Sequence, residues 1–126
     1  MRTIMRVLVG LVGLLTTIIG LGFLLQPEVM AAAFFVKPTA LQGMATLRGD
    51  FPGFFIGASV FALWGAWKAD ARPLLVPLVL LAIVLFGRTV SIVLDGTGPD
   101  TFPPMVAEAL MIAVLVIARG TFKDAR

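Results

Sequence analysis

The chain has 126 residues, of which 60% are hydrophobic and 13% are charged, and its net charge is +3. Soluble domains usually carry about 25% charged residues, and a domain this small leaves much of its surface in water. The composition therefore excludes an ordinary soluble fold and predicts a single membrane domain over residues 1–126. Cysteine and histidine are absent, which excludes disulfides, thiol catalysis and the usual zinc and haem ligands, so we expect no metal and no cofactor.

The first apolar run covers residues 7–25, contains no charged side chain and follows Arg2 and Arg6. About 20 apolar residues cross the hydrocarbon core of a bilayer, so we expect the first membrane span here. A cleaved signal peptide is the competing interpretation, with the alanines at residues 31–33 as its cleavage site. The length of the run and the three hydrophobic runs that follow it favour a membrane span.

A segment of mixed character, residues 26–50, separates the first run from the second. Its apolar part, residues 29–36, is too short to cross a bilayer and predicts a short interfacial helix. A helical pattern resumes near residue 40 and leads into the second span at residues 51–67. Pro52 leaves two interpretations open: one continuous helix is kinked there, or Asp50 caps a new helix that has Pro52 in its first turn.

Two further apolar runs complete the chain. The third covers residues 74–94 and is interrupted by Arg88, and the fourth covers residues 103–121 and contains Glu108. Proline suits the first turn of a helix, so the two prolines at residues 103–104 mark the start of the fourth span. Together the runs predict an all-α fold, an integral membrane four-helix bundle with a short interfacial helix between spans one and two.

The basic residues predict the orientation of these spans. Cytoplasmic loops of membrane proteins carry an excess of lysine and arginine, so we expect both termini in the cytoplasm. These residues lie at the borders of apolar runs, which argues for topology and against nucleic acid as a partner. The basic residues assigned to the cytoplasmic side are Arg2, Arg6, Lys68, Arg72, Arg119, Lys123 and Arg126.

Small residues in the second span predict where helices approach closely. Gly53 and Gly57 form a GxxxG pattern, and Ala58 and Ala62 continue a stripe of small residues on a neighbouring face. In lipid, such residues allow backbones to pack closely. Packing within one chain is the favoured interpretation, and a face for a homo-oligomer is the alternative.

The charged residues within the spans are the candidate site. With a rise of about 1.5 Å per residue, Arg88 lies about 21 Å from the start of its span and Glu108 about 20 Å from the end of its own. Opposite charges at similar depth predict an ion pair. Arg88, Ser91 and Asp95 share one helix face. Together with Arg48, Asp50 and Glu108, these three residues are predicted to form one of two things. The first is a structural ion-pair network. The second is a pocket for an anion, because guanidinium groups suit carboxylate and phosphate.

These motifs, in this order, resemble a small bacterial membrane family catalogued as domain of unknown function 4345. The resemblance is carried by Arg48-Gly49 at the entry to a glycine-rich span, by Gly87-Arg88 with Ser91 and Asp95-Gly96, and by Glu108 in the last span. It covers nearly the whole chain and implies a four-helix membrane protein in which Arg48, Arg88, Asp95 and Glu108 belong together. Phe51-Pro52 departs from a smooth glycine-rich helix. The resemblance implies a protein of the bacterial inner membrane and implies no activity.

The sequence favours a non-enzymatic protein that binds a lipid headgroup or a small anion in the outer half of the bundle, with the lipid bilayer as its surroundings. An accessory subunit of a membrane complex and a small transporter are the alternatives. Asp95 and Glu108 are of the residue types used for acid and base catalysis, but no cysteine or histidine accompanies them. An enzyme is therefore the less favoured class.

Overall fold

A computed structural model describes residues 1–124, and within them the secondary structure consists of helices joined by short connections, without β-strands. Arg126, which the sequence assigned to the cytoplasmic group, lies outside the described residues. An all-α fold is therefore confirmed for this part of the chain. The helices are α1 (Arg2–Leu25), α2 (Pro27–Ala33), α3 (Leu41–Lys68), α4 (Leu75–Asp95) and α5 (Phe102–Asp124).

Three of these helices are long and apolar enough to cross a membrane, namely α1, α4 and the part of α5 at Phe102–Lys123. The protein is therefore an integral membrane protein by the composition of its helices. With 28 residues, α3 is long enough to span, but Arg48 and Asp50 near its start and Lys68 at its end reduce its hydropathy. A fourth span remains a prediction. The short helix expected between the first two long helices is present as α2.

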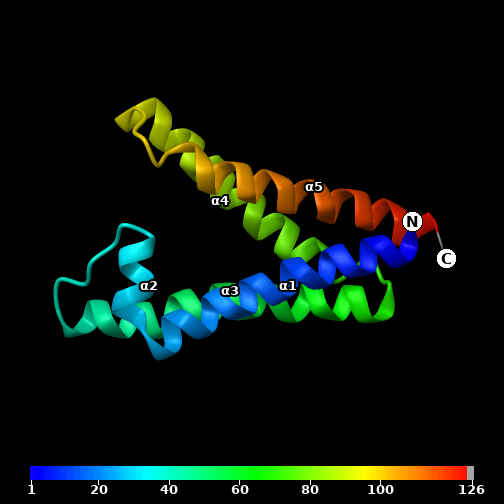
Figure 1. The fold of residues 1–126 in the computed structure, drawn as a ribbon, viewed down its shortest axis with the longest axis horizontal. Coiled ribbons are helices and arrows are strands. Elements are labelled where there is room, and N and C mark those ends of the chain that lie inside the picture. Colours follow the sequence, from blue (N-terminus) through cyan, green and yellow to red (C-terminus); the bar gives the residue numbers. More distant parts are fainter. Residues whose placement is uncertain (125–126) are drawn as a thin grey trace.

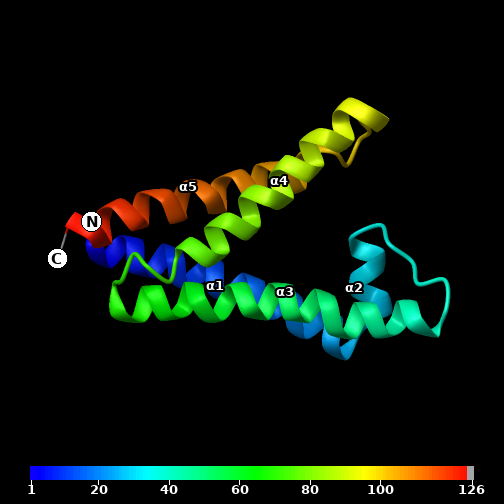
Figure 2. The same ribbon diagram turned by 180° about the vertical axis from the view of Figure 1, so that it is seen from behind.

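The four long helices form two antiparallel pairs (Figure 1). Helices α1 and α3 lie side by side along most of their length, and α4 packs against α5. The pairs meet at the end that holds both termini and the connection between α3 and α4, here termed the closed end. They separate toward the opposite end, which holds α2 and the connection between α4 and α5 and is termed the open end; the reverse view shows the same separation (Figure 2).

Helix α3 continues through Pro52 without a break. Proline has no backbone N–H, so the carbonyl of Arg48, four residues earlier, receives no helical hydrogen bond from it. The helix ends at Ala69, which adopts left-handed backbone angles (φ 48°). Of the two interpretations left open by Pro52, the structure shows the continuous helix, and Asp50 lies inside it rather than capping a new one.

Arginine side chains stabilise the closed end. Arg6 donates to the carbonyl oxygens of Ala66 (2.8 Å) and Trp67 (2.9 Å), which lie in the last turn of α3. The last carbonyls of a helix lack partners within it, so a cation at this position satisfies them and complements the helix dipole. Arg119 of α5 donates to the carbonyl of Ala71 in the turn before α4 (3.3 Å). Arg6 and Arg119, which the charge pattern assigned to the cytoplasmic side, thus also connect helices through hydrogen bonds.

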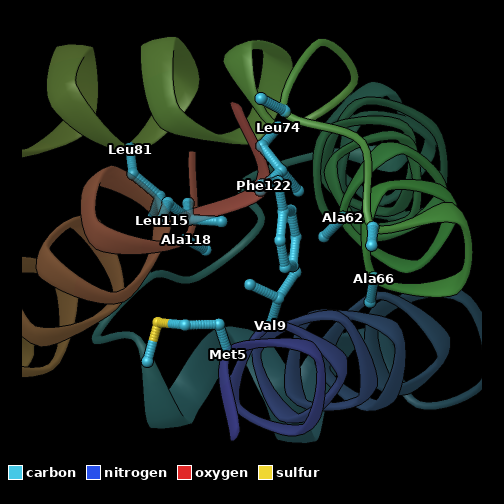
Figure 3. Close-up of a cluster of buried hydrophobic side chains, with 11 residues drawn as sticks. Met5, Val9, Ala62, Ala66, Leu74, Leu81, Leu115, Ala118 and Phe122 are labelled. Carbon is cyan, nitrogen blue, oxygen red and sulfur yellow. The ribbon is translucent and has the colours of Figure 1, made fainter. Parts of the chain in front are cut away.

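The largest buried cluster joins the two helix pairs at the closed end (Figure 3). Phe122 of α5 is fully buried, and its ring lies among Val9 of α1, Ala62 and Ala66 of α3, and Leu74. Small side chains on α3 leave room for this large ring between the helices. The other residues of the cluster include Met5, Ala69, Ala71, Leu81, Leu115 and Ala118.

Helices α1 and α3 approach most closely at glycines of α1. A Cβ atom on Gly20 would lie 2.6 Å from Cγ1 of Ile56 and 3.2 Å from Cβ of Phe55, and one on Gly13 would lie 2.7 Å from Cγ of Leu63. These distances are too short for a Cβ atom unless the neighbouring side chains or the helices shift, so glycine permits this close contact.

The packing role predicted for Gly53 and Gly57 stays a prediction, because neither glycine lies at a close helix contact within the described residues. A Cβ atom on either would meet no other atom within 4 Å, because α1 lies against the face of α3 that carries Ile56 and Leu63 instead. Ala58 and Ala62, by contrast, are buried, at 4% and 0% exposed. Within the chain, the buried alanines of the small-residue pattern lie in helix contacts, whereas the two glycines face open space.

Replacing Gly20 by valine is expected to destabilise the protein by about 1–3 kcal/mol, the usual effect of overpacking. The added side chain would collide with Ile56 and Phe55 and force α1 and α3 apart. The matched control is Gly10→Val on the same helix, where a Cβ meets nothing within 4 Å. Thermal unfolding in one detergent measures both variants, and equal midpoints would contradict the predicted contact.

Candidate functional site

A cleft of 490 Å³ lies between the two helix pairs. All four long helices contribute to its walls, and Phe34, which follows α2, also lines it. Its lining is apolar except for Thr16 and three charged residues, Asp50, Arg88 and Glu108. Thr16 donates its hydroxyl proton within α1, to the carbonyl oxygens of Val12 and Gly13. The apolar residues of the lining include Leu15, Ile19, Phe54, Ala58, Leu81, Val84, Ala107 and Met111.

A cluster of phenylalanines forms one wall of the cleft. Phe23 of α1 stacks on Phe51 and Phe55 of α3, with ring centroids 4.8 Å and 5.8 Å apart. Phe34 packs on Phe23 at 5.3 Å and attaches the end of α2 to this cluster. Phe51 and Phe55 are four residues apart, a spacing that places them on one helix face and was visible in the sequence. These two phenylalanines were not among the site residues predicted from the sequence.

Arg88 of α4 and Glu108 of α5 form the ion pair that their similar depth predicted. Nε of Arg88 lies 2.7 Å from Oε1 of Glu108. The Glu108 side chain is 9% exposed and that of Arg88 is 37% exposed. Among residues 1–124, these two buried atoms have no other polar partner. Glu108 is therefore committed to Arg88, while the guanidinium retains N–H groups that can meet a ligand in the cleft.

Asp50 is the third charged residue of the cleft and comes from α3, in the other helix pair. Its side chain is exposed, and no ion pair to it occurs in the described part of the chain. The cleft thus contains two carboxylates and one guanidinium, with a formal excess of one negative charge. In the part of the chain that the structure describes, no three residues of metal-binding type converge.

The structure does not bring Arg48 to this cleft. Arg48 lines a separate surface pocket of 260 Å³ together with Glu28 and Met44. Arg48 and Asp50 are two positions apart on a continuous helix, so their side chains leave it about 200° apart. The predicted set of charged residues is therefore divided between two places.

Ser91 and Asp95 lie in the last turns of α4 and are exposed. The Ser91 hydroxyl donates to Oδ2 of Asp95 at 3.1 Å. Neither residue lines the cleft, although both share a helix face with Arg88. Of the six predicted site residues, the structure groups Asp50, Arg88 and Glu108 in the cleft and places Ser91, Asp95 and Arg48 outside it.

The geometry of the cleft can be compared with what is known of similar sequences. A family described as a domain of unknown function (DUF4345) matches residues 4–119. The chain belongs to this family. The match spans every cleft residue, from Val12 to Met111, and confirms the resemblance carried by the motifs. No curated protein and no solved structure matches the chain, and the description of the DUF4345 family assigns no activity, so function is argued from the cleft.

Proposed function

We propose that this member of the DUF4345 family is a non-enzymatic membrane protein that binds one lipid in the cleft between its helix pairs. The observation that carries the proposal is the combination, in one cleft of 490 Å³, of apolar walls from four helices with a charged group. Ligand pockets typically have volumes of about 300–1,000 Å³, with mostly apolar walls and a few polar groups. An amphipathic molecule matches both the apolar walls and the charged groups of the cleft.

The position of the charged residues supports this assignment. Arg88 is seven residues from the end of α4 and Glu108 six residues from the start of α5, which corresponds to about 10 Å from the open end in each case. Charged side chains inside a span are costly and usually face a cavity or a partner. The exposed part of the Arg88 guanidinium suits a phosphate group, and the apolar walls continue past Ala58 and Leu81 for an acyl chain.

A substitution that fills the cleft should displace the lipid. Ala107 is exposed and lines the cleft, so phenylalanine there occupies ligand space without disturbing the core. We expect Ala107→Phe to weaken lipid retention about tenfold, which corresponds to about 1.4 kcal/mol. Native mass spectrometry from a mild detergent measures the lipid-bound fraction.

Ala113→Phe is the matched control, because Ala113 lies on the same helix, is also exposed and does not line the cleft. The proposal is wrong if the unmodified protein retains no lipid, or if both variants retain it equally.

One observation favours a second candidate function, that of an accessory subunit in a membrane complex. Gly49, Gly53 and Gly57 form a stripe on α3 where a Cβ meets no atom within 4 Å. Spaced four residues apart, such glycines allow a second helix to pack closely. The same mass measurement distinguishes this role, because a complex with another chain, or a homo-oligomer, would appear as added protein mass that Gly53→Leu removes.

We also propose that the closed end faces the cytoplasm of a bacterial cell, with the protein in the inner membrane. The support is the position of basic residues at helix ends that lie there: Arg2 and Arg6 near the start of α1, Lys68 at the end of α3 and Arg119 near the end of α5. A reporter that is active only in the periplasm should be active when fused after Thr97 and silent when fused at the C-terminus. Activity of the C-terminal fusion would overturn either the orientation or the fourth span.

A further inference from the structure

The two walls of the cleft present unlike charges. Asp50 comes from α3 and has no ion-pair partner in the described part of the chain. Arg88 comes from α4 and is paired with Glu108 through Nε, so its other guanidinium N–H groups remain for a ligand. Glu108 is nearly buried and engaged by Arg88, so it is not available to a ligand. A molecule that enters the cleft therefore meets a carboxylate on one wall and a guanidinium on the other.

These charges select among headgroups. A purely anionic headgroup would pair with Arg88 but would leave Asp50 uncompensated and would bring a second negative charge toward it. A purely cationic headgroup would pair with Asp50 but would offer no acceptor to the remaining N–H groups of Arg88. A ligand that enters the cleft displaces water from Asp50 and Arg88, and a charge that loses water without gaining a partner is costly. A headgroup with one group of each sign compensates both and is favoured over either.

We propose that the cleft takes a zwitterionic lipid whose phosphate meets Arg88 and whose ammonium, carrying N–H groups, donates to Asp50. The inference rests on the proposed lipid-binding function and adds the chemical class of the headgroup. An ammonium with N–H groups forms charge-assisted hydrogen bonds to a carboxylate, which a trimethylated ammonium cannot form.

Lipid competition followed by native mass spectrometry tests the inference. The delipidated protein is offered equal amounts of phosphatidylethanolamine and phosphatidylglycerol, and separately of phosphatidylethanolamine and phosphatidylcholine. We expect about tenfold preference for phosphatidylethanolamine in each pair, which corresponds to about 1.4 kcal/mol. Asp50→Asn should abolish the preference while total lipid occupancy is retained.

Glu28→Gln is the matched control, because it makes the same charge change outside the cleft, beside Arg48, and should leave the preference unchanged. Excess soluble glycerophosphoethanolamine should not displace the lipid, and displacement would show that the free zwitterion is the ligand. If the unmodified protein binds lipid without preference, or if Asp50→Asn keeps the preference, the headgroup inference is wrong and lipid binding stands. If no lipid of any class is retained, the proposed function itself is wrong.

Discussion

Replacing Arg88 by leucine is expected to lower the free energy of unfolding by about 3–5 kcal/mol, because the change leaves Glu108 buried without a counter-charge. Glu108 is only 7% exposed, and its Oε1 has no other polar partner within residues 1–124. Glu108→Leu should cost less, since the Arg88 side chain is 37% exposed and its long stem can move the guanidinium toward water. We therefore expect Arg88→Leu to lose more stability than Glu108→Leu.

The double variant, with leucine at both positions, should be more stable than Arg88→Leu alone. Removing both partners eliminates the isolated charge and leaves only apolar side chains between α4 and α5. The measurement is a double-mutant cycle on unfolding in detergent, made on delipidated protein so that loss of a ligand at Arg88 does not contribute. Strict additivity of the two single losses would show that the pair carries no coupling energy.

Replacing Phe122 by alanine should lower the free energy of unfolding by about 3–5 kcal/mol, the usual range when a large aromatic side chain is removed from a protein core. Phe122 is fully buried and contacts side chains from both helix pairs at the closed end. Its removal leaves a cavity that Ala62 and Ala66 are too small to fill. The loss should lower the thermal midpoint of unfolding in detergent.

Ile117→Ala provides the control for this change. Ile117 lies on the same helix and is 50% exposed, so its truncation removes apolar area from a surface that faces lipid, where little packing is lost. A midpoint for Phe122→Ala no lower than that of the control would contradict the role of this ring in joining the pairs.

Much of the fold follows from composition and hydrophobic pattern. The apolar runs predicted at residues 74–94 and 103–121 correspond closely to α4 (Leu75–Asp95) and α5 (Phe102–Asp124), because in lipid only a helix satisfies every backbone group along a single segment. The run at residues 51–67 was harder to delimit. Proline at position 52 permits either a kink or a new start, and only the packing of α3 along α1 shows that the helix is continuous.

The pairing of Arg88 with Glu108 was also accessible from the sequence. A charge inside an apolar helix has to find a partner, and the constant rise of a helix converts sequence position into depth. Depth alone does not specify direction around the helix axis. For this reason Arg48, which lies near Asp50 in depth, was grouped with the cleft residues although its side chain leaves α3 on another face.

The tertiary structure decided which side chains of each helix face a neighbouring helix and which face the cleft. It placed Gly13 and Gly20, rather than Gly53 and Gly57, at the contact of α1 with α3, since every small residue permits close approach but only those facing a neighbour produce it. The cleft is likewise a property of the packing, because Asp50, Phe34 and Glu108 come from segments far apart in the chain. The sequence by itself determined a helical membrane protein with an internal ion pair. The contact of its two helix pairs at the closed end, beyond which they separate around the cleft, involves side chains such as Phe122 whose partners no local pattern specifies.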